Sequence, residues 1–252
     1  MTEEQILTWD EWFQLASNPL DESTAQKLQT YLQLHRPGTP EIYALFQLHH
    51  QPTHSLWHTL FQTALQQYAL ADEQTPGQIS AETAAYLQQQ AAQFPHDALV
   101  VDALIELLLG CKKCPMSFNE FVLHQLEDLL VAKGQLTEKD VQRIQQVIKS
   151  ESGASRTRID RREAEFLLSL NRRTSADVHH ESWQKLFVDA LVRHLLLDPQ
   201  SPGTISVAEG NWLADQLADD DLTQPSVKML LRDLQNKSLS IEGRLQKMLE
   251  NG

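Results

Sequence analysis

Cysteine is nearly absent from this chain, and long hydrophobic runs are missing altogether. Only 2 of the 252 residues are cysteines, too few for the disulfide framework that stabilises many small secreted domains. No stretch reaches the roughly 18 consecutive apolar residues that a membrane-spanning helix needs. The first residues, Met1-Thr-Glu-Glu, lack the positive charge and the apolar core of a signal peptide. We therefore expect a cytoplasmic protein without a transmembrane segment.

Basic residues are outnumbered, and the common catalytic motifs are missing. The chain has 21 Lys and Arg against 34 Asp and Glu, which gives a formal net charge of −13. Because phosphate groups are bound by basic surfaces, bare nucleic acid is not an expected partner. The sequence contains no glycine-rich phosphate loop, no Gly-x-Ser-x-Gly and no His-Glu-x-x-His. We therefore predict no catalytic residues, no cofactor and no enzymatic activity.

Helical periodicity is what the sequence has in abundance. Apolar residues recur three and four positions apart along most of the chain, and no segment alternates convincingly as a strand would. Capping pairs, with a Ser, Thr or Asp three residues before an acid, mark helix starts at Ser117/Glu120, Thr137/Asp140 and Asp160/Glu163. We predict an all-α bundle or array of about 12 helices. The predicted helices are 8–16, 22–35, 40–50, 54–71, 80–94, 97–110, 117–133, 137–150, 160–172, 181–197, 206–218, 225–236 and 240–250.

One segment occurs twice in diverged form. Residues 55–87 and 181–213 align without a gap at an offset of 126, and 13 of the 33 aligned residues are identical. Unrelated sequences would share about two. The identical residues form the apolar stripe of a helix, followed by Pro-Gly-x-Ile-Ser, which closes that helix and caps the next. We predict two pseudo-repeated helical halves, residues 1–126 and 127–252, as two domains or as one compact domain, with 151–158 as the best candidate linker.

The repeated loop of the second half has the spacing of a calcium-binding loop. An EF-hand loop binds calcium through oxygen atoms at alternating positions and a final carboxylate. With Pro202 in the place of one ligand, the loop resembles a degenerate EF-hand. The alternative is a Pro-Gly turn followed by a serine cap, with no metal. The candidate ligands are Asp198, Gln200, Thr204, Ser206 and Glu209.

Cys111 and Cys114 form a Cys-x-x-Cys pair with two lysines between them. Neighbouring lysines favour the thiolate, which is the form that binds zinc. A zinc site would need histidines from elsewhere in the chain, because there is no second pair. The alternative is two thiols at the end of an apolar helix, before Pro115, with no metal.

Histidines precede the repeated helix in both halves. His54 and His180 occupy the same place in the repeat, three residues before a tryptophan, and His179 adjoins His180. One interpretation is a polar residue at the start of a helix. The alternative is a metal ligand, because His50, His54 and His58 have a four-residue spacing that suits one helix face.

Three helix starts share the pattern Gly-x-apolar-Ser/Thr, at Gly77–Ser80, Gly134–Thr137 and Gly203–Ser206. The pattern resembles the motif of TerB-like (tellurite-resistance) helical domains, in which an Asp usually precedes the glycine. That resemblance implies acidic metal binding and a stress-related or membrane-associated complex. Residues 159–171 and 182–191 are similar to a family of uncharacterised bacterial helical proteins, which implies a bacterial cytoplasmic protein without a known activity.

A duplicated helical scaffold without catalytic motifs favours a non-enzymatic interaction or regulatory module, because grooves between helices bind partner helices. A protein partner is therefore expected. The alternative function is a metal-responsive stress protein that uses calcium at the repeated loop or zinc at the cysteine pair. The sequence leaves the oligomeric state and the identity of the partner open.

Overall fold

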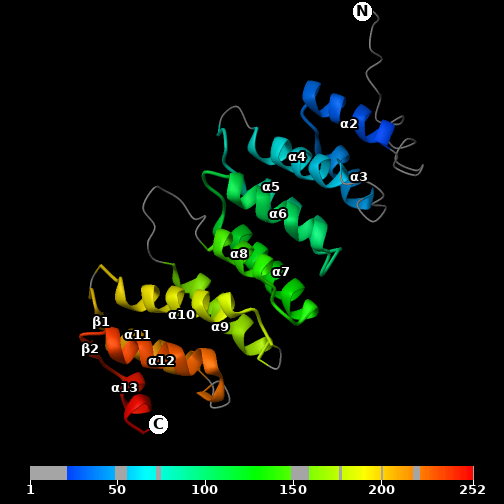
Figure 1. Cartoon of the computed structure of the whole chain (residues 1–252). Helices are drawn as coiled ribbons and strands as arrows, with labels where there is room; N and C mark the ends of the chain where they lie inside the picture. Colours follow the sequence, from blue (N-terminus) through cyan, green and yellow to red (C-terminus); the bar gives the residue numbers. More distant parts are fainter. Residues whose placement is uncertain are drawn as a thin grey trace, which may run out of the picture. The chain divides into compact units, whose positions relative to one another are not determined.

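The computed structural model describes residues 22–48, 56–71, 75–148, 159–175, 178–199, 201–217 and 222–251. The predicted helix at 8–16 and the predicted linker at 151–158 lie outside these residues. The elements are α2 (Glu22–Leu34), α3 (Thr39–Leu48), α4 (Leu56–Leu70), α5 (Ala81–Ala91), α6 (Ala98–Gly110), α7 (Met116–Lys133), α8 (Glu138–Val147), α9 (Arg161–Arg173), α10 (Glu181–Leu196), β1 (Thr204–Ile205), α11 (Val207–Gln216), α12 (Pro225–Lys237), β2 (Ser240–Ile241) and α13 (Arg244–Asn251) (Figure 1).

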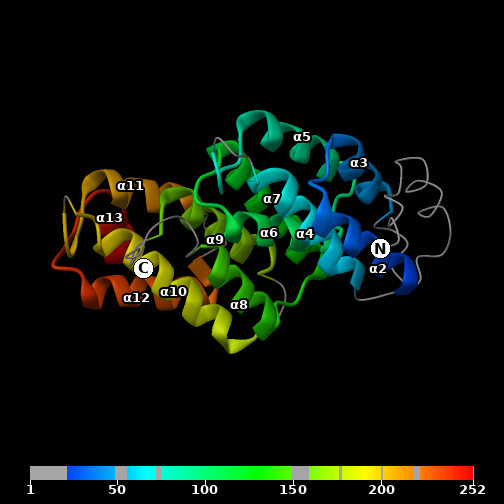
Figure 2. The ribbon, with the colours of Figure 1, turned by 90° about the horizontal axis from the view of Figure 1, so that it is seen from above.

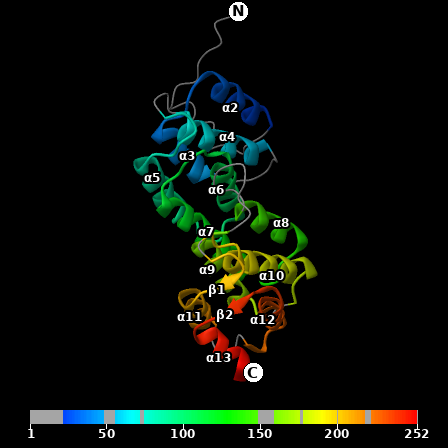
Figure 3. The same ribbon diagram turned by 90° about the vertical axis from the view of Figure 1, so that its left-hand side faces the viewer.

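The prediction of an all-α fold is confirmed. Apart from two strands of two residues each, the regular elements of the described residues are helices. The strands β1 and β2 pair in parallel, and their arrows lie side by side in Figure 3. Neither strand was predicted, because two residues are too few for the alternation that identifies a strand.

Local capping chemistry sets several helix starts. Thr137 and Asp160 are N-cap residues, and each forms the predicted capping box with the acid three residues later. The predicted cap at Ser117 is wrong, because α7 begins one residue earlier, at Met116. The predicted start of the last helix at 240 is also wrong. Residues 240–241 pair with β1, and Gly243 then takes a left-handed conformation with φ of 77° before α13 begins.

The chain divides into two compact units, Met1–Leu126 and Glu127–Gly252. In the first unit, α4 packs against α2, α3 and α6 (Figure 2). The core there includes the fully buried side chains of Phe46, Phe61 and Leu65. In the second unit, α10 packs against α8, α9 and α12, and α11 packs against α13. The helix α10 is the centre of its unit, and its residues Trp183, Phe187 and Leu191 are buried.

The described parts of the loops after α4 and α10 share a left-handed glycine and its backbone hydrogen bonds. Gly77 and Gly203 have φ angles of 79° and 77°. Their N–H groups donate to the carbonyls of Leu70 and Leu196 at 2.9 and 2.8 Å. In each loop the glycine carbonyl also accepts a hydrogen bond of 2.7 Å from the segment after a later helix, at Lys112 or Leu239. These bonds explain why both copies of the segment carry the same glycine; a common origin of the two halves stays a prediction.

Candidate functional site

A pocket of about 230 Å³, lined mostly by residues with polar side chains, lies in the second unit. Its walls come from the end of α9, the segment that leads into α10, the first turn of α10 and the start of α12. The lining is uncharged except for one glutamate and two histidines. The lining residues are Asn171, Ser175, His179, His180, Glu181, Trp183, Gln184, Gln224, Pro225 and Ser226.

Asn171 is the hub of a hydrogen-bond network in this wall. Its Oδ1 accepts from the indole N–H of Trp183 at 3.2 Å and from the hydroxyl of Ser226 at 3.0 Å. Its Nδ2 donates to Oε1 of Gln224 at 2.6 Å. The three residues Asn171, Trp183 and Ser226 are all buried. Because buried polar groups are costly when they lack a partner, this network holds α9, α10 and α12 in one arrangement.

The start of α12 depends on this network rather than on a local cap. Gln224 is the N-cap residue, but its side chain makes no capping hydrogen bond and accepts from Asn171 instead. In the first unit, by contrast, the N-cap Asp97 of α6 accepts from the N–H groups of Leu99 and Val100 at 2.9 and 3.1 Å. The side chain of Gln224 therefore makes a long-range contact beside the pocket in place of a local cap.

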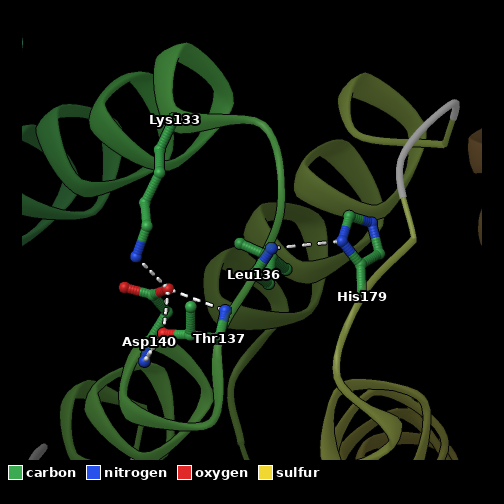
Figure 4. A network of polar contacts seen from close by, with 5 residues as sticks. All are labelled: Lys133, Leu136, Thr137, Asp140 and His179. Carbon is green, nitrogen blue, oxygen red and sulfur yellow. Dashed lines mark hydrogen bonds and ion pairs between the residues drawn. The ribbon is translucent and has the colours of Figure 1, made fainter.

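The two histidines of the pocket lining connect it to the α7–α8 turn and to the start of α10. Nδ1 of His179 accepts from the N–H of Leu136, in the turn between α7 and α8, at 3.3 Å (Figure 4). The N–H of His180 donates to the carbonyl of Leu136 at 3.0 Å. His180 is also the N-cap of α10, where its Nδ1 accepts from the N–H of Ser182. Both imidazoles thus act as hydrogen-bond acceptors for backbone amides.

The α7–α8 turn that carries Leu136 is itself held by an ion pair. Oδ2 of Asp140 accepts from Nζ of Lys133 and from the N–H of Thr137 (Figure 4). Burial alone would raise the pKa of the Asp140 carboxyl, but the hydrogen bonds from Lys133 and Thr137 outweigh it and lower this pKa. The stabilisation by this carboxylate is therefore present at neutral pH and is lost as the pH falls through the lowered pKa.

The predicted calcium ligands lie along the loop after α10. Thr204 is in β1, Ser206 is the N-cap of α11, and Gln200 lies outside the described residues. Glu209 forms the capping box of α11: its Oε2 accepts from the N–H and the hydroxyl of Ser206 at 3.0 and 2.8 Å. Asp198 follows the C-terminus of α10. The loop therefore has the turn and the serine cap of the non-metal interpretation, and the metal interpretation stays a prediction.

The two cysteines lie in the first unit, after α6. Cys111 is the C-cap residue of α6, and its thiol donates to the carbonyl of Leu108 at 3.2 Å. The lysines between the cysteines pair with the loop after α4, because the N–H of Ile79 donates to the carbonyl of Lys113 at 2.9 Å. Cys111 and Cys114 are both partly exposed. Within the part of the chain that the structure describes, no group of three or more His, Cys, Asp or Glu side chains is placed to hold a metal ion.

The sequence motifs did not predict Asn171, Gln224 or Ser226 as site residues. One signal was present: Asn171 lies three residues after Leu168 and four after Leu167, on the buried stripe of α9. A polar side chain on such a stripe requires a buried partner. Its partners lie 12 to 55 residues away, so local patterns do not identify them.

Comparison with protein-family models, curated proteins and solved structures finds no match to this chain. None of the described helices is both long enough and apolar enough to cross a membrane. The resemblances to TerB-like domains, to EF-hands and to bacterial helical proteins therefore rest on the quoted sequence motifs.

Proposed function

We propose that this chain is a non-enzymatic interaction module of a bacterial cytoplasm, and that the pocket of the second unit receives a polar side chain of a protein partner. The main observation in support of this proposal is the pocket itself. It is lined mostly by residues with polar side chains, and the buried residues of its wall are joined by the hydrogen bonds of Asn171. Its volume of about 230 Å³ is below the range of roughly 300 to 1,000 Å³ that is typical of small-molecule sites. A cavity of this size suits one or two inserted side chains.

The chemistry of the lining supports an interaction role. The oxygen of Asn171 is already occupied by two donors, and the histidine Nδ1 atoms are occupied by backbone amides. These groups therefore position the walls and are not arranged as a nucleophile with its base. Exposed polar groups at the rim, on His180 and Glu181, remain for a partner's hydrogen-bonding groups.

Site-specific photo-crosslinking in bacterial cells tests the proposal. A benzoylphenylalanine residue in place of Gln184, in the pocket lining, is expected to form a discrete crosslinked product with a partner protein. The same residue in place of Asp189, which is exposed on α10 and does not line the pocket, serves as the control. Equal products from both positions, or none from position 184 in a folded protein, would contradict the assignment of the pocket as the partner site.

One observation favours the metal-responsive alternative. Oε1 of Glu209 is buried and accepts no hydrogen bond from the described residues. At the α7–α8 turn the corresponding acid, Asp140, is neutralised by Lys133, the residue before the turn glycine. Pro202 stands before Gly203 and offers no such charge. A bound cation at Glu209 would supply the missing charge, which is the way calcium engages the last acid of an EF-hand loop.

Elemental analysis of protein purified without a His-tag or a chelator separates the two functions. The interaction proposal expects a folded protein with no stoichiometric metal. The alternative expects close to one calcium per chain, lost in Glu209→Gln and retained in Glu242→Gln, an exposed acid on the adjacent loop. Stoichiometric zinc that is lost in Cys111→Ser or Cys114→Ser would instead support the cysteine site.

A further inference from the structure

Three loops place an apolar residue between a left-handed glycine and a Ser or Thr N-cap, and one of them differs in how that apolar residue is bound. In the first unit the N–H of Ile79 donates to a backbone carbonyl, that of Lys113, at 2.9 Å. Ile205 follows Gly203 in the same way and lies in the parallel ladder between β1 and β2. Leu136, after Gly134, donates instead to Nδ1 of His179 at 3.3 Å. The acceptor for Leu136 is therefore a titratable imidazole, whereas the acceptor for Ile79 is a backbone carbonyl that does not titrate.

Only the neutral imidazole can accept this hydrogen bond. A protonated ring carries hydrogen on both nitrogens and has no acceptor left. The side chain of Leu136 is fully buried, and the carbonyl of the same residue is bound by the N–H of His180 at 3.0 Å. Protonation of His179 at Nδ1 would set an N–H group against the N–H of Leu136, and the Leu136 N–H would lose its acceptor.

We propose that His179 makes the contact between the α7–α8 turn and the segment before α10 sensitive to pH, so that a proton taken up from solvent releases the segment from the turn. Histidine is the side chain whose charge ordinarily changes between about pH 5 and 8. The expected direction is fixed by the bond: the contact is intact at neutral and higher pH, and it is lost as the pH falls and His179 becomes charged.

Among the described residues, charged and titratable groups near the contact come from the α7–α8 turn and from the segment itself. The α7–α8 turn carries the paired Lys133 and Asp140, whose charges compensate each other. The segment itself continues with His180 and Glu181 at the pocket rim. From α9 and α12 the pocket presents uncharged groups, those of Asn171, Ser175, Gln224 and Ser226.

His180 adds a second hydrogen bond to the same segment. Its Nδ1 accepts from the N–H of Ser182 at 3.3 Å at the start of α10. Since His179 and His180 both line the pocket, release of the segment would also move a pocket wall. That consequence for binding rests on the proposed function, whereas the pH-sensitive contact does not.

Hydrogen exchange of the Leu136 amide tests the contact without any ligand. On going from about pH 7.5 to 5, the protection of this amide, corrected for the intrinsic exchange rate, is expected to fall by at least about tenfold, the factor that one lost hydrogen bond represents. In His179→Asn, whose side-chain oxygen takes the place of Nδ1 but does not titrate, the protection is expected to stay constant. His180→Asn should retain the fall at Leu136, and His58→Asn, an exposed change in the first unit, serves as the control.

A loss of protection in His179→Asn equal to that of the wild type would overturn the inference, as would constant protection in the wild type. Nitrogen NMR of the imidazole rings covers the case in which His179→Asn does not fold. For the wild type at neutral pH, we expect the His179 tautomer with its proton on Nε2 and an unprotonated Nδ1. A ring protonated at Nδ1 at neutral pH is incompatible with the bond from Leu136 and would refute the proposal.

Discussion

Gly210→Ala is expected to destabilise the second unit by about 3 kcal/mol, the upper end of the typical range for overpacked sites. Gly210 is inside α11 and buried, and a methyl group built there would overlap the carbonyl oxygen of Glu242. The backbone at Glu242 cannot easily move away from such a methyl group, for two reasons. The N–H of Glu242 donates to the carbonyl of Ile205 at 3.0 Å, and the following residue, Gly243, is in the left-handed conformation.

The sign of the effect makes Gly210→Ala a sharp test. Helix propensity alone favours alanine over glycine by about 1 kcal/mol in a helix interior, so a structure without this close approach would gain stability. Urea unfolding followed by circular dichroism measures the difference in the free energy of unfolding.

Gly110→Ala, at the end of α6, is the matched control. A methyl group there would meet Leu70 Cδ1 at 3.6 Å, an ordinary contact, so we expect no loss of stability. An unchanged or increased stability of Gly210→Ala would show that α11 and the loop before α13 are not packed as described.

Asn171→Leu is expected to lower the free energy of unfolding by about 3 kcal/mol, because each buried polar partner left unpaired costs roughly 1 to 3 kcal/mol. The substitution removes the acceptor of the Trp183 indole N–H and of the Ser226 hydroxyl, and it removes the donor to Gln224. The leucine side chain has a similar volume, so the loss measures the network rather than a cavity. The measurement is again urea unfolding followed by circular dichroism.

Gln184→Leu provides the comparison for Asn171→Leu. It also replaces an amide in the pocket lining by an aliphatic side chain, but Gln184 is only partly buried. We expect a change within about 0.5 kcal/mol for this substitution. If Asn171→Leu were as mild as Gln184→Leu, the network would not hold the three helices together, and the basis for a preformed pocket would be removed.

The helices and several of their starts could be predicted because the responsible interactions are local. The capping boxes at Thr137 and Asp160 each involve residues three positions apart, and both are present. The start of α13 could not be predicted from local pattern. Ser240 and Ile241 resemble a helix start in sequence, but they pair with residues 204–205, more than 30 positions earlier.

The candidate site could not be predicted from the sequence either, because its contacts also join residues that are distant in the chain. The motifs that stood out, the loop at 198–209 and the pair Cys111/Cys114, stood out because their members are close in sequence. In the structure, Glu209 caps α11 and the thiol of Cys111 bonds to the end of α6, both local contacts. The pocket is instead assembled from three helices through Asn171, and the histidine contact joins residues 43 positions apart.

The sequence by itself therefore determined the all-α class, the approximate helix limits and the glycine turns with their serine or threonine caps. These depend on periodicity, on side chains within one helical turn and on the left-handed conformation that glycine accepts. Only the tertiary structure decided which polar side chains meet. Hydrogen bonds such as Trp183–Asn171 and Leu136–His179 form between residues that are distant in the chain, and their partners are specified by how the helices pack.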